Sequence, residues 1–210
     1  KTKTSTPTRF QFMALASASL NQPPLQLHVH PLDDVGYAAQ HRAFDFLHNT
    51  YEHRNGLGLF QGPSLSGKTT IIRHFAEEQK QKCSVAVVNG AGLGVTALLE
   101  TVLREFGFEY KFNSVNELTS MLRVFLQQQA SNGETPMLFI ENAHEIKPSA
   151  MSVLCDLAEM RAGAFYALKL VLVSDRAIHY LTQASATECI AKRLTGDFHL
   201  EPMTMDETAD

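Results

Sequence analysis

The sequence predicts an α/β fold, in which helices cover both faces of a parallel sheet. Five short apolar runs alternate with longer segments whose apolar residues recur at helical spacing. The first four runs are mainly continuous in their apolar residues rather than alternating, as in strands that are buried on both faces. A glycine-containing loop joins the first run to the helical segment after it. Strand, loop and helix in that order are typical of phosphate-binding proteins.

The composition is that of a folded domain with no strong charge bias. The 210 residues are 44% hydrophobic and 19% charged, enough for one core and part of a second domain. No run approaches the length of a transmembrane helix. A net charge of -4 gives no overall case for nucleic acid as a partner. Cys83, Cys155 and Cys189 are far apart and lack metal-ligand spacing, so we expect buried free thiols in a reducing compartment.

Residues 1–32 predict an extended N-terminal arm or linker. They are rich in Ser, Thr, Gln and Pro, and residues 25–30 alternate enough to allow a short edge strand. The first twenty residues superficially suggest a signal peptide, but their apolar stretch is short and rich in Ser and Ala. The chain begins at Lys1 rather than Met, so we expect it to be a piece of a longer protein.

Residues 33–201 predict the α/β domain itself. Mainly apolar runs predict strands at 57–60, 84–88, 136–140 and 168–173, and we expect a short fifth strand at 197–200. Helical spacing and capping residues predict helices at 37–51, 69–78, 96–106, 115–126, 148–161, about 177–183 and 187–194. We expect residues 127–133 to form a polar connector.

Residues 61–70 carry the pattern on which the functional prediction depends, Gly-x-x-x-x-Gly-Lys-Thr. Gly62 and Gly67 allow conformations and close approaches that a Cβ would block. Lys68 supplies positive charge for the β- and γ-phosphates, and Thr69 a hydroxyl for Mg²⁺. We therefore predict a P-loop that binds ATP or ADP with Mg²⁺. The residues assigned to nucleotide binding are Gly62, Pro63, Ser64, Leu65, Ser66, Gly67, Lys68, Thr69 and Thr70.

The P-loop makes the expected sheet more specific. A strand-plus-helix unit lies between the P-loop strand and the strand at 136–140. In P-loop NTPases this insertion marks the division with strand order 5-1-4-3-2. We therefore predict a parallel sheet of that order, with helices on both faces.

The strand at 136–140 ends where a P-loop protein places its second acidic motif. The usual pattern is four apolar residues, then Asp for Mg²⁺ and Glu to activate water. Here Glu141 stands at the Asp position and can hold Mg²⁺ through water, while Asn142 stands at the Glu position. Asn142 can orient a water but cannot accept its proton, and losing a general base costs about 10²–10⁴-fold in rate. Glu145 could partly substitute, and an ordinary strand-end turn is the alternative.

Two further residues complete the predicted catalytic set of Lys68, Glu141, Asn142, Ser174 and Arg193. Ser174 ends the strand at 168–173, where a polar side chain can sense the γ-phosphate. Asp175 next to it could simply cap a helix. Arg193 could act on a neighbouring subunit's γ-phosphate as an arginine finger. It could equally be a solvated residue at a helix C-terminus, and Lys192 is less suited to the finger role.

With these motifs placed, the chain resembles AAA+ ATPases of the ExeA/GspA type over about residues 34–208. That family accompanies type II secretion, with relatives for MSHA-type pili and exopolysaccharide loci. The resemblance is carried by residues 62–70, by the strand ending at Glu141, and by residues 191–194, 198–203 and 207–208. It implies that residues 202–210 begin a helical lid that is truncated here. The departures from the family pattern are Glu141 and Asn142.

The resemblance implies an ATP-Mg²⁺-binding AAA+ domain, a slow or impaired ATPase that drives or gates assembly of an envelope machine. Its partners would be envelope proteins or further copies of itself. It would lie in the cytoplasm, with any inner-membrane anchor outside this fragment. One alternative is a non-hydrolysing, nucleotide-gated interaction module. Another is a DNA-associated transposition or replication regulator, because those ATPases look similar.

Overall fold

The computed structural model describes residues 38–109, 114–178 and 187–201. The chain divides into two units, Lys1–Val35 and Gly36–Asp210, and every described residue belongs to the second. The predicted N-terminal arm, the strand allowed at 25–30, most of the helix expected at 177–183 and the lid segment 202–210 lie outside the described residues.

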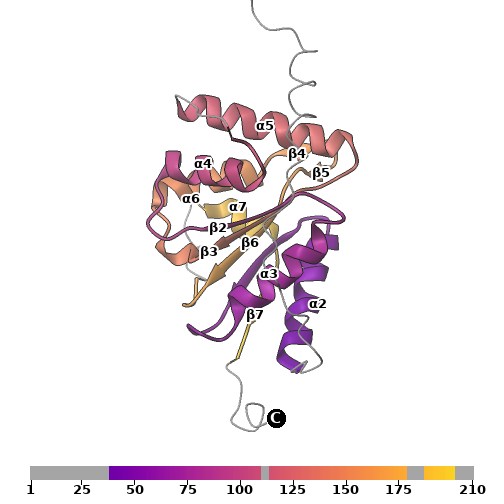
Figure 1. Ribbon diagram of the computed structural model, residues 1–210, viewed down its shortest axis with the longest axis vertical. Coiled ribbons are helices and arrows are strands. Elements are labelled where there is room, and N and C mark those ends of the chain that lie inside the picture. The colour runs from indigo at the N-terminus through magenta and orange to yellow at the C-terminus, as the bar shows by residue number, and fades with distance from the viewer. Residues whose placement is uncertain (1–37, 110–113, 179–186, 202–210) are drawn as a thin grey trace, which may run out of the picture. The chain divides into compact units, whose positions relative to one another are not determined.

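A five-stranded parallel sheet forms the centre of the second unit, in the order β2-β3-β6-β1-β7 (Figure 1). Its strands are β1 (Leu57–Gln61), β2 (Val85–Asn89), β3 (Met137–Glu141), β6 (Lys169–Ser174) and β7 (Leu194–His199). If these five strands are numbered 1 to 5 along the chain, their order from the β7 edge is 5-1-4-3-2. The predicted topology is therefore confirmed. The P-loop strand β1 lies between β6 and β7, and these two strands therefore flank the phosphate site.

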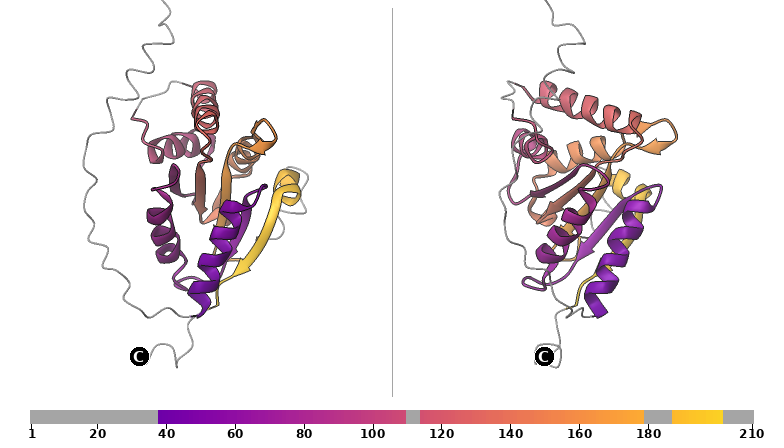
Figure 2. Two further views of the ribbon diagram at one scale, coloured as in Figure 1. Left: turned by 90° about the vertical axis from the view of Figure 1, so that its right-hand side faces the viewer. Right: turned by 45° about the vertical axis from the view of Figure 1, so that its right-hand side comes forward.

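Helices cover both faces of the sheet (Figure 2). On one face lie α2 (Ala38–Glu52) and α3 (Lys68–Gln79), and on the other α4 (Val95–Glu105), α5 (Val115–Ser131), α6 (Pro148–Ala158) and α7 (Glu188–Arg193). Successive residues of a strand join opposite cores, since Phe139 packs with α3 while Leu138 and Ile140 pack with the other helices. Burial on both faces explains why β1, β2, β3 and β6 are mainly apolar, whereas the partly exposed β7 is not.

Several element boundaries differ from the prediction. Helix α5 continues to Ser131, so the polar connector expected at 127–133 is wrong for most of its length. Gln and Ala are good helix formers, and the helix gives way only near Gly133, whose φ is +81°. Helix α6 ends at Ala158 rather than at 161. A small antiparallel hairpin of β4 (Arg161–Ala162) and β5 (Phe165–Tyr166) follows, which the sequence did not predict.

The cysteines also differ from expectation. Cys155 of α6 and Cys189 of α7 form a disulfide, and only Cys83 is a buried free thiol. The two partners are 34 residues apart, and sequence spacing alone does not reveal such a pairing. None of the helices in the described part combines the length and apolarity that a membrane span requires.

Candidate nucleotide site

The loop between β1 and α3 has the backbone that its glycines predict. Gly67 has a φ of +90° and Leu65, at the exposed tip, has a φ of +65°. A Cβ on Gly62 would lie 2.5 Å from the carbonyl oxygen of Leu200, so that position requires glycine. The Gly62 N–H donates to the Ser174 carbonyl at 3.2 Å, which ties the loop to the end of β6.

The loop leads directly into the N-terminus of α3. Gly67 occupies the N-cap and has no side chain to cap the helix. The N–H groups of the first turn, Lys68 to Thr70, have no preceding helical carbonyl to bond. These N–H groups and the positive end of the helix dipole favour an anion at this point. The residues present therefore fit a phosphate group.

Lys68 folds back over the loop rather than extending into solvent. It is 6% exposed, and its Nζ donates to the carbonyl oxygens of Gly62 at 2.8 Å and Pro63 at 2.6 Å. Ser66 Oγ lies 3.3 Å away. The ammonium group is thus held at the centre of the loop, where the predicted contact with the β- and γ-phosphates would occur.

Asp175, the first residue after β6, is the acidic partner of this loop. Its Oδ1 lies 2.9 Å from Lys68 Nζ, and its Oδ2 accepts a hydrogen bond from Ser64 Oγ at 2.5 Å. These two hydrogen bonds hold the pKa of the Asp175 carboxyl below its usual range. Sequence reasoning offered Asp175 only as a helix cap and missed this role.

Thr69 and Glu141 meet across the first turn of α3 and the end of β3. Thr69 Oγ1 donates to Glu141 Oε1 at 2.5 Å. A hydroxyl and a carboxylate are oxygen donors of the kind that Mg²⁺ prefers, so the pair fits the predicted metal role. Mg²⁺ bound there would neutralise charge on the β- and γ-phosphate oxygens. Glu141 reaches the P-loop despite its extra methylene.

Asn142 follows Glu141 and adopts a left-handed backbone, with φ +52° and ψ +41°. Asn tolerates this conformation better than most residues. Its Nδ2 donates to Asn89 Oδ1 at 2.9 Å, which links the ends of β3 and β2. The structure therefore brings Asn142 to the predicted strand end with its amide nitrogen already bonded to a neighbouring strand.

Ser174 is 1% exposed, and its hydroxyl bonds away from the P-loop. The hydroxyl donates to the Arg176 carbonyl at 2.7 Å and accepts from the Arg176 N–H at 3.1 Å. It also lies 3.0 Å from Nδ1 of His144, a residue that sequence reasoning did not consider. Glu145, the proposed substitute base, is exposed and lies 3.5 Å from the other ring nitrogen of His144. Of the two residues that end β6, the structure brings Asp175 rather than the Ser174 hydroxyl into contact with the loop.

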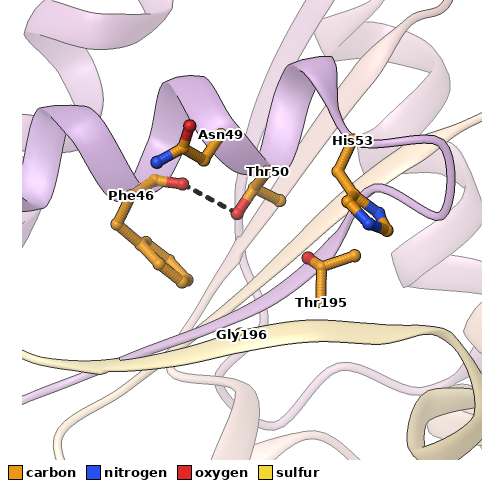
Figure 3. Close-up of a pocket in the computed structure, with 6 residues that line it drawn as sticks. All are labelled: Phe46, Asn49, Thr50, His53, Thr195 and Gly196. Carbon is orange, nitrogen blue, oxygen red and sulfur yellow. Dashed lines mark hydrogen bonds between the residues drawn. The ribbon is translucent and has the colours of Figure 1, made fainter.

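A cavity lies away from the phosphate site, between α2 and β7 (Figure 3). Its volume is about 210 Å³. Leu194 pairs with Leu57, so the neighbouring Thr195 lies near the starting end of the strands, whereas the P-loop follows their opposite end. The lining residues are Phe46, Asn49, Thr50, His53, Thr195 and Gly196.

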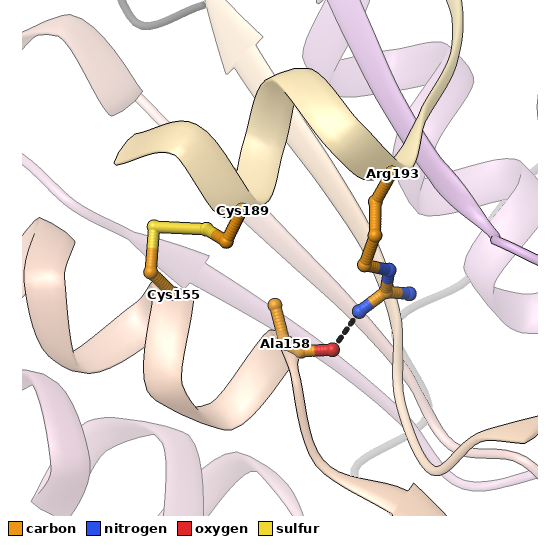
Figure 4. Close-up of a disulfide and its surroundings, with 4 residues drawn as sticks. All are labelled: Cys155, Ala158, Cys189 and Arg193. Carbon is orange, nitrogen blue, oxygen red and sulfur yellow. Dashed lines mark hydrogen bonds between the residues drawn. A yellow bond between two sulfur atoms is a disulfide. The ribbon is translucent and has the colours of Figure 1, made fainter. Parts of the chain in front are cut away.

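The structure contradicts both roles considered for Arg193. The side chain is 1% exposed, so it is neither solvated nor available to a neighbour's phosphate. Its guanidinium donates to the carbonyl of Ala158 (Figure 4). It also donates to the carbonyls of Asn55 and Leu168. It also lies 3.8 Å from the ring centre of Tyr166. Burial lowers its pKa to about 10. Asn55 and Leu168 precede β1 and β6, and Ala158 ends α6, so the group binds carbonyls at the edge of the sheet opposite the P-loop.

The sheet order and the loop after its first strand define a P-loop nucleoside triphosphatase. A family model described as "AAA domain" matches residues 51–179, and the chain belongs to this family. It is 22% identical over 188 residues to "General secretion pathway protein A" of Aeromonas hydrophila. That match covers 88% of this chain but only 34% of the relative, so the chain spans about a third of that protein. The resemblance to ExeA/GspA-type AAA+ ATPases is confirmed.

Solved structures with the same fold include origin-recognition proteins. ORC2 of Aeropyrum pernix, solved as ADPNP-ADP complexes, has a TM-score of 0.59 at 14% identity. The match covers 90% of this chain and 51% of the ORC2 chain. Cdc6p of Pyrobaculum aerophilum has a TM-score of 0.56 at 18% identity, and the match covers 91% of this chain and 50% of the Cdc6p chain. Drosophila ORC bound to DNA also matches, with a TM-score of 0.56 at 18% identity, covering 80% and 43%. These identities show the fold alone.

Proposed function

We propose that this chain is an ATP-Mg²⁺-binding AAA+ domain whose hydrolysis is slow or impaired, and that it drives or gates assembly of a bacterial envelope machine. The observation that carries nucleotide binding is the buried Lys68 ammonium at the centre of a glycine loop. The Thr69–Glu141 contact beside it supports the Mg²⁺ assignment. Lys68 and the α3 amides bind phosphate, and Thr69 and Glu141 hold the metal ion.

The proposed weakness in hydrolysis follows from Asn142. An amide accepts no proton from an attacking water, and this one is bonded to Asn89. Arg193 is buried and cannot complete a neighbour's site, so this chain offers no trans-acting group at that position. Turnover well below ordinary enzyme rates of about 1 per second or more is therefore expected.

The envelope role is supported by the similarity of this chain to General secretion pathway protein A of Aeromonas hydrophila. We place this domain in the cytoplasm, where ATP is available, with anchoring to the inner membrane through parts outside this chain. Its partners would be proteins of the envelope complex or further copies of itself. Introducing Lys68→Ala into the whole protein in its host should then abolish secretion or surface assembly without lowering the protein's abundance.

Nucleotide binding is tested directly by calorimetric titration of the purified chain with ADP and Mg²⁺. Lys68→Ala should weaken binding at least tenfold, because it removes the positive charge facing the phosphates. Lys80→Ala is the matched control, since Lys80 is an exposed lysine near the end of the same helix that pairs with Glu77. Equal affinity in the wild type and Lys68→Ala would refute the assignment.

A second candidate function, a nucleotide-gated interaction module without turnover, is favoured by the same Asn142–Asn89 bond. The variant Asn142→Glu decides between slow hydrolysis and none. If the site is otherwise competent, a carboxylate at this position should raise the ATPase rate about 10²–10⁴-fold. Wild-type turnover of about 1 per second would exclude the module, and so would a rate left unchanged by Asn142→Glu.

A further inference from the structure

We propose that Asp175 is an internal competitor for the phosphate site, and that a nucleotide must displace its carboxylate before the P-loop can close on phosphate. The inference rests on the proposed nucleotide binding and adds a residue that lowers its affinity. It assigns Asp175 a role in setting affinity, in place of the helix cap that its sequence position suggests.

The contacts of the carboxylate carry the proposal. One oxygen lies 2.9 Å from Lys68 Nζ, and the other accepts from Ser64 Oγ at 2.5 Å. Both donors belong to the loop, and Lys68 is the group expected to bind the β- and γ-phosphates. A carboxylate presents negative charge and two acceptor oxygens, as one edge of a phosphate does. Asp175 thus satisfies the loop in the way a phosphate would.

The backbone around Asp175 is fixed, so displacement involves its side chain. The Ser174 carbonyl accepts from the Gly62 N–H, and the Ser174 hydroxyl bonds both backbone groups of Arg176. The Asp175 side chain is 32% exposed and has solvent on one side. Rotation about its side-chain torsions therefore releases Lys68 without moving β6.

Charge explains why the competition matters at neutral pH. The hydrogen bonds from Lys68 and Ser64 keep the carboxyl ionised, because they lower its pKa. Nucleotide binding must break the Lys68–Asp175 ion pair and then leave the carboxylate near phosphate of the same charge. Both effects reduce affinity, and both disappear if the carboxylate is replaced by a neutral group.

The test compares the affinity of the wild type and Asp175→Asn for ADP with Mg²⁺ by calorimetric titration. The variant should bind about 5- to 20-fold more tightly, at the lower end of typical coupling effects because the carboxylate is partly exposed. Asp156→Asn is the matched control, since Asp156 is an exposed carboxylate on α6, and its affinity should equal that of the wild type. A merely structural Asp175 would give equal or weaker binding on substitution, and that result overturns the proposal.

Two further readouts keep the test decisive. Asp175→Ser, checked by its melting curve, should show the same gain if Asp175→Asn folds poorly. In the wild type, the ¹³C carboxyl signal of Asp175 should shift when ADP is added, and an unmoved signal contradicts displacement. If the wild type and both variants bind no nucleotide, the proposed function fails and this inference fails with it. Equal binding by all of them sinks the inference alone.

Discussion

At the scale of single residues, the sequence predicted contacts that are local in the chain better than contacts that are not. The P-loop residues 62–70 act through their own backbone and one lysine, so their pattern was sufficient. Arg193 was misread because its burial depends on Asn55, Ala158 and Leu168, which are distant in sequence. Asp175 could have been found, since the predicted order places the strand before it beside the P-loop strand.

Replacing Arg193 tests its structural role. Arg193→Met should lower the free energy of unfolding by about 3–5 kcal/mol, because buried carbonyls of Asn55, Ala158 and Leu168 lose their donors. Arg193→Lys should recover only part of the loss, since an ammonium lacks the planar fork of a guanidinium. Urea denaturation measures both, with the exposed neighbour Lys192→Ala as the control expected to change little. An Arg193→Met variant as stable as the wild type would restore the case for a solvated residue.

The ion pair of Asp175 predicts a pH-dependent contribution to stability. Its pKa in the folded protein lies below the unfolded value, so the contribution is present above about pH 4 and is lost as pH falls further. Asp175→Asn should be less stable than the wild type by about 0.5–1 kcal/mol at pH 7, a value limited by partial exposure. Urea denaturation from pH 7 down to pH 3 should show this difference shrinking. A constant difference across that range would contradict the ion pair.

At the scale of elements, periodicity predicted the five strands and the long helices but not every boundary. Continuous apolar runs are a strong signal because both sheet faces are buried. The polar end of α5 has no such signal, since Gln127 to Ser131 suit a helix or a loop equally in pattern. The β4–β5 hairpin was missed because its strands have two residues each, too few for any alternation to show.

The disulfide between α6 and α7 should stabilise the folded chain. It closes a loop of 34 residues, and removing it should lower the free energy of unfolding by about 2–4 kcal/mol. Melting curves of the oxidised protein with and without a dithiol reductant measure this. The variant with Cys155→Ala and Cys189→Ala should melt at the same temperature as the reduced wild type, whether or not reductant is present. Alkylation of all three cysteines in the oxidised, unfolded protein would show that the bond does not form.

At the scale of the whole molecule, the fold was predictable because one motif fixes its topology. The P-loop identifies the first strand, and the inserted strand and helix then determine the order that the structure shows. The site is only partly predictable. Its sequence pattern identifies Lys68, Thr69 and Glu141 but not the Asp175 carboxylate that contacts the loop. Predicting this contact requires the register between β1 and the neighbouring strand β6, which Asp175 follows.

Nucleotide binding should stabilise the whole fold, because only the folded chain forms the loop. At an ADP concentration of about 100 times the dissociation constant, with Mg²⁺, the gain should be about 2.7 kcal/mol. A thermal shift assay measures it as a rise in melting temperature. The rise should vanish in Lys68→Ala and persist in Lys80→Ala. A rise of equal size in Lys68→Ala would place the nucleotide elsewhere.

The contact between Leu200 and the P-loop joins the segment after β7 to the phosphate site. The Leu200 N–H donates to the Gln61 carbonyl at 2.7 Å, and its own carbonyl faces Gly62 so closely that no Cβ would fit. The chain therefore leaves β7 beside the loop that would bind phosphate. Whatever follows residue 201 begins within one residue of this contact. A displacement of the P-loop backbone at Gln61 or Gly62 would therefore move Leu200 directly, because these backbone contacts join them.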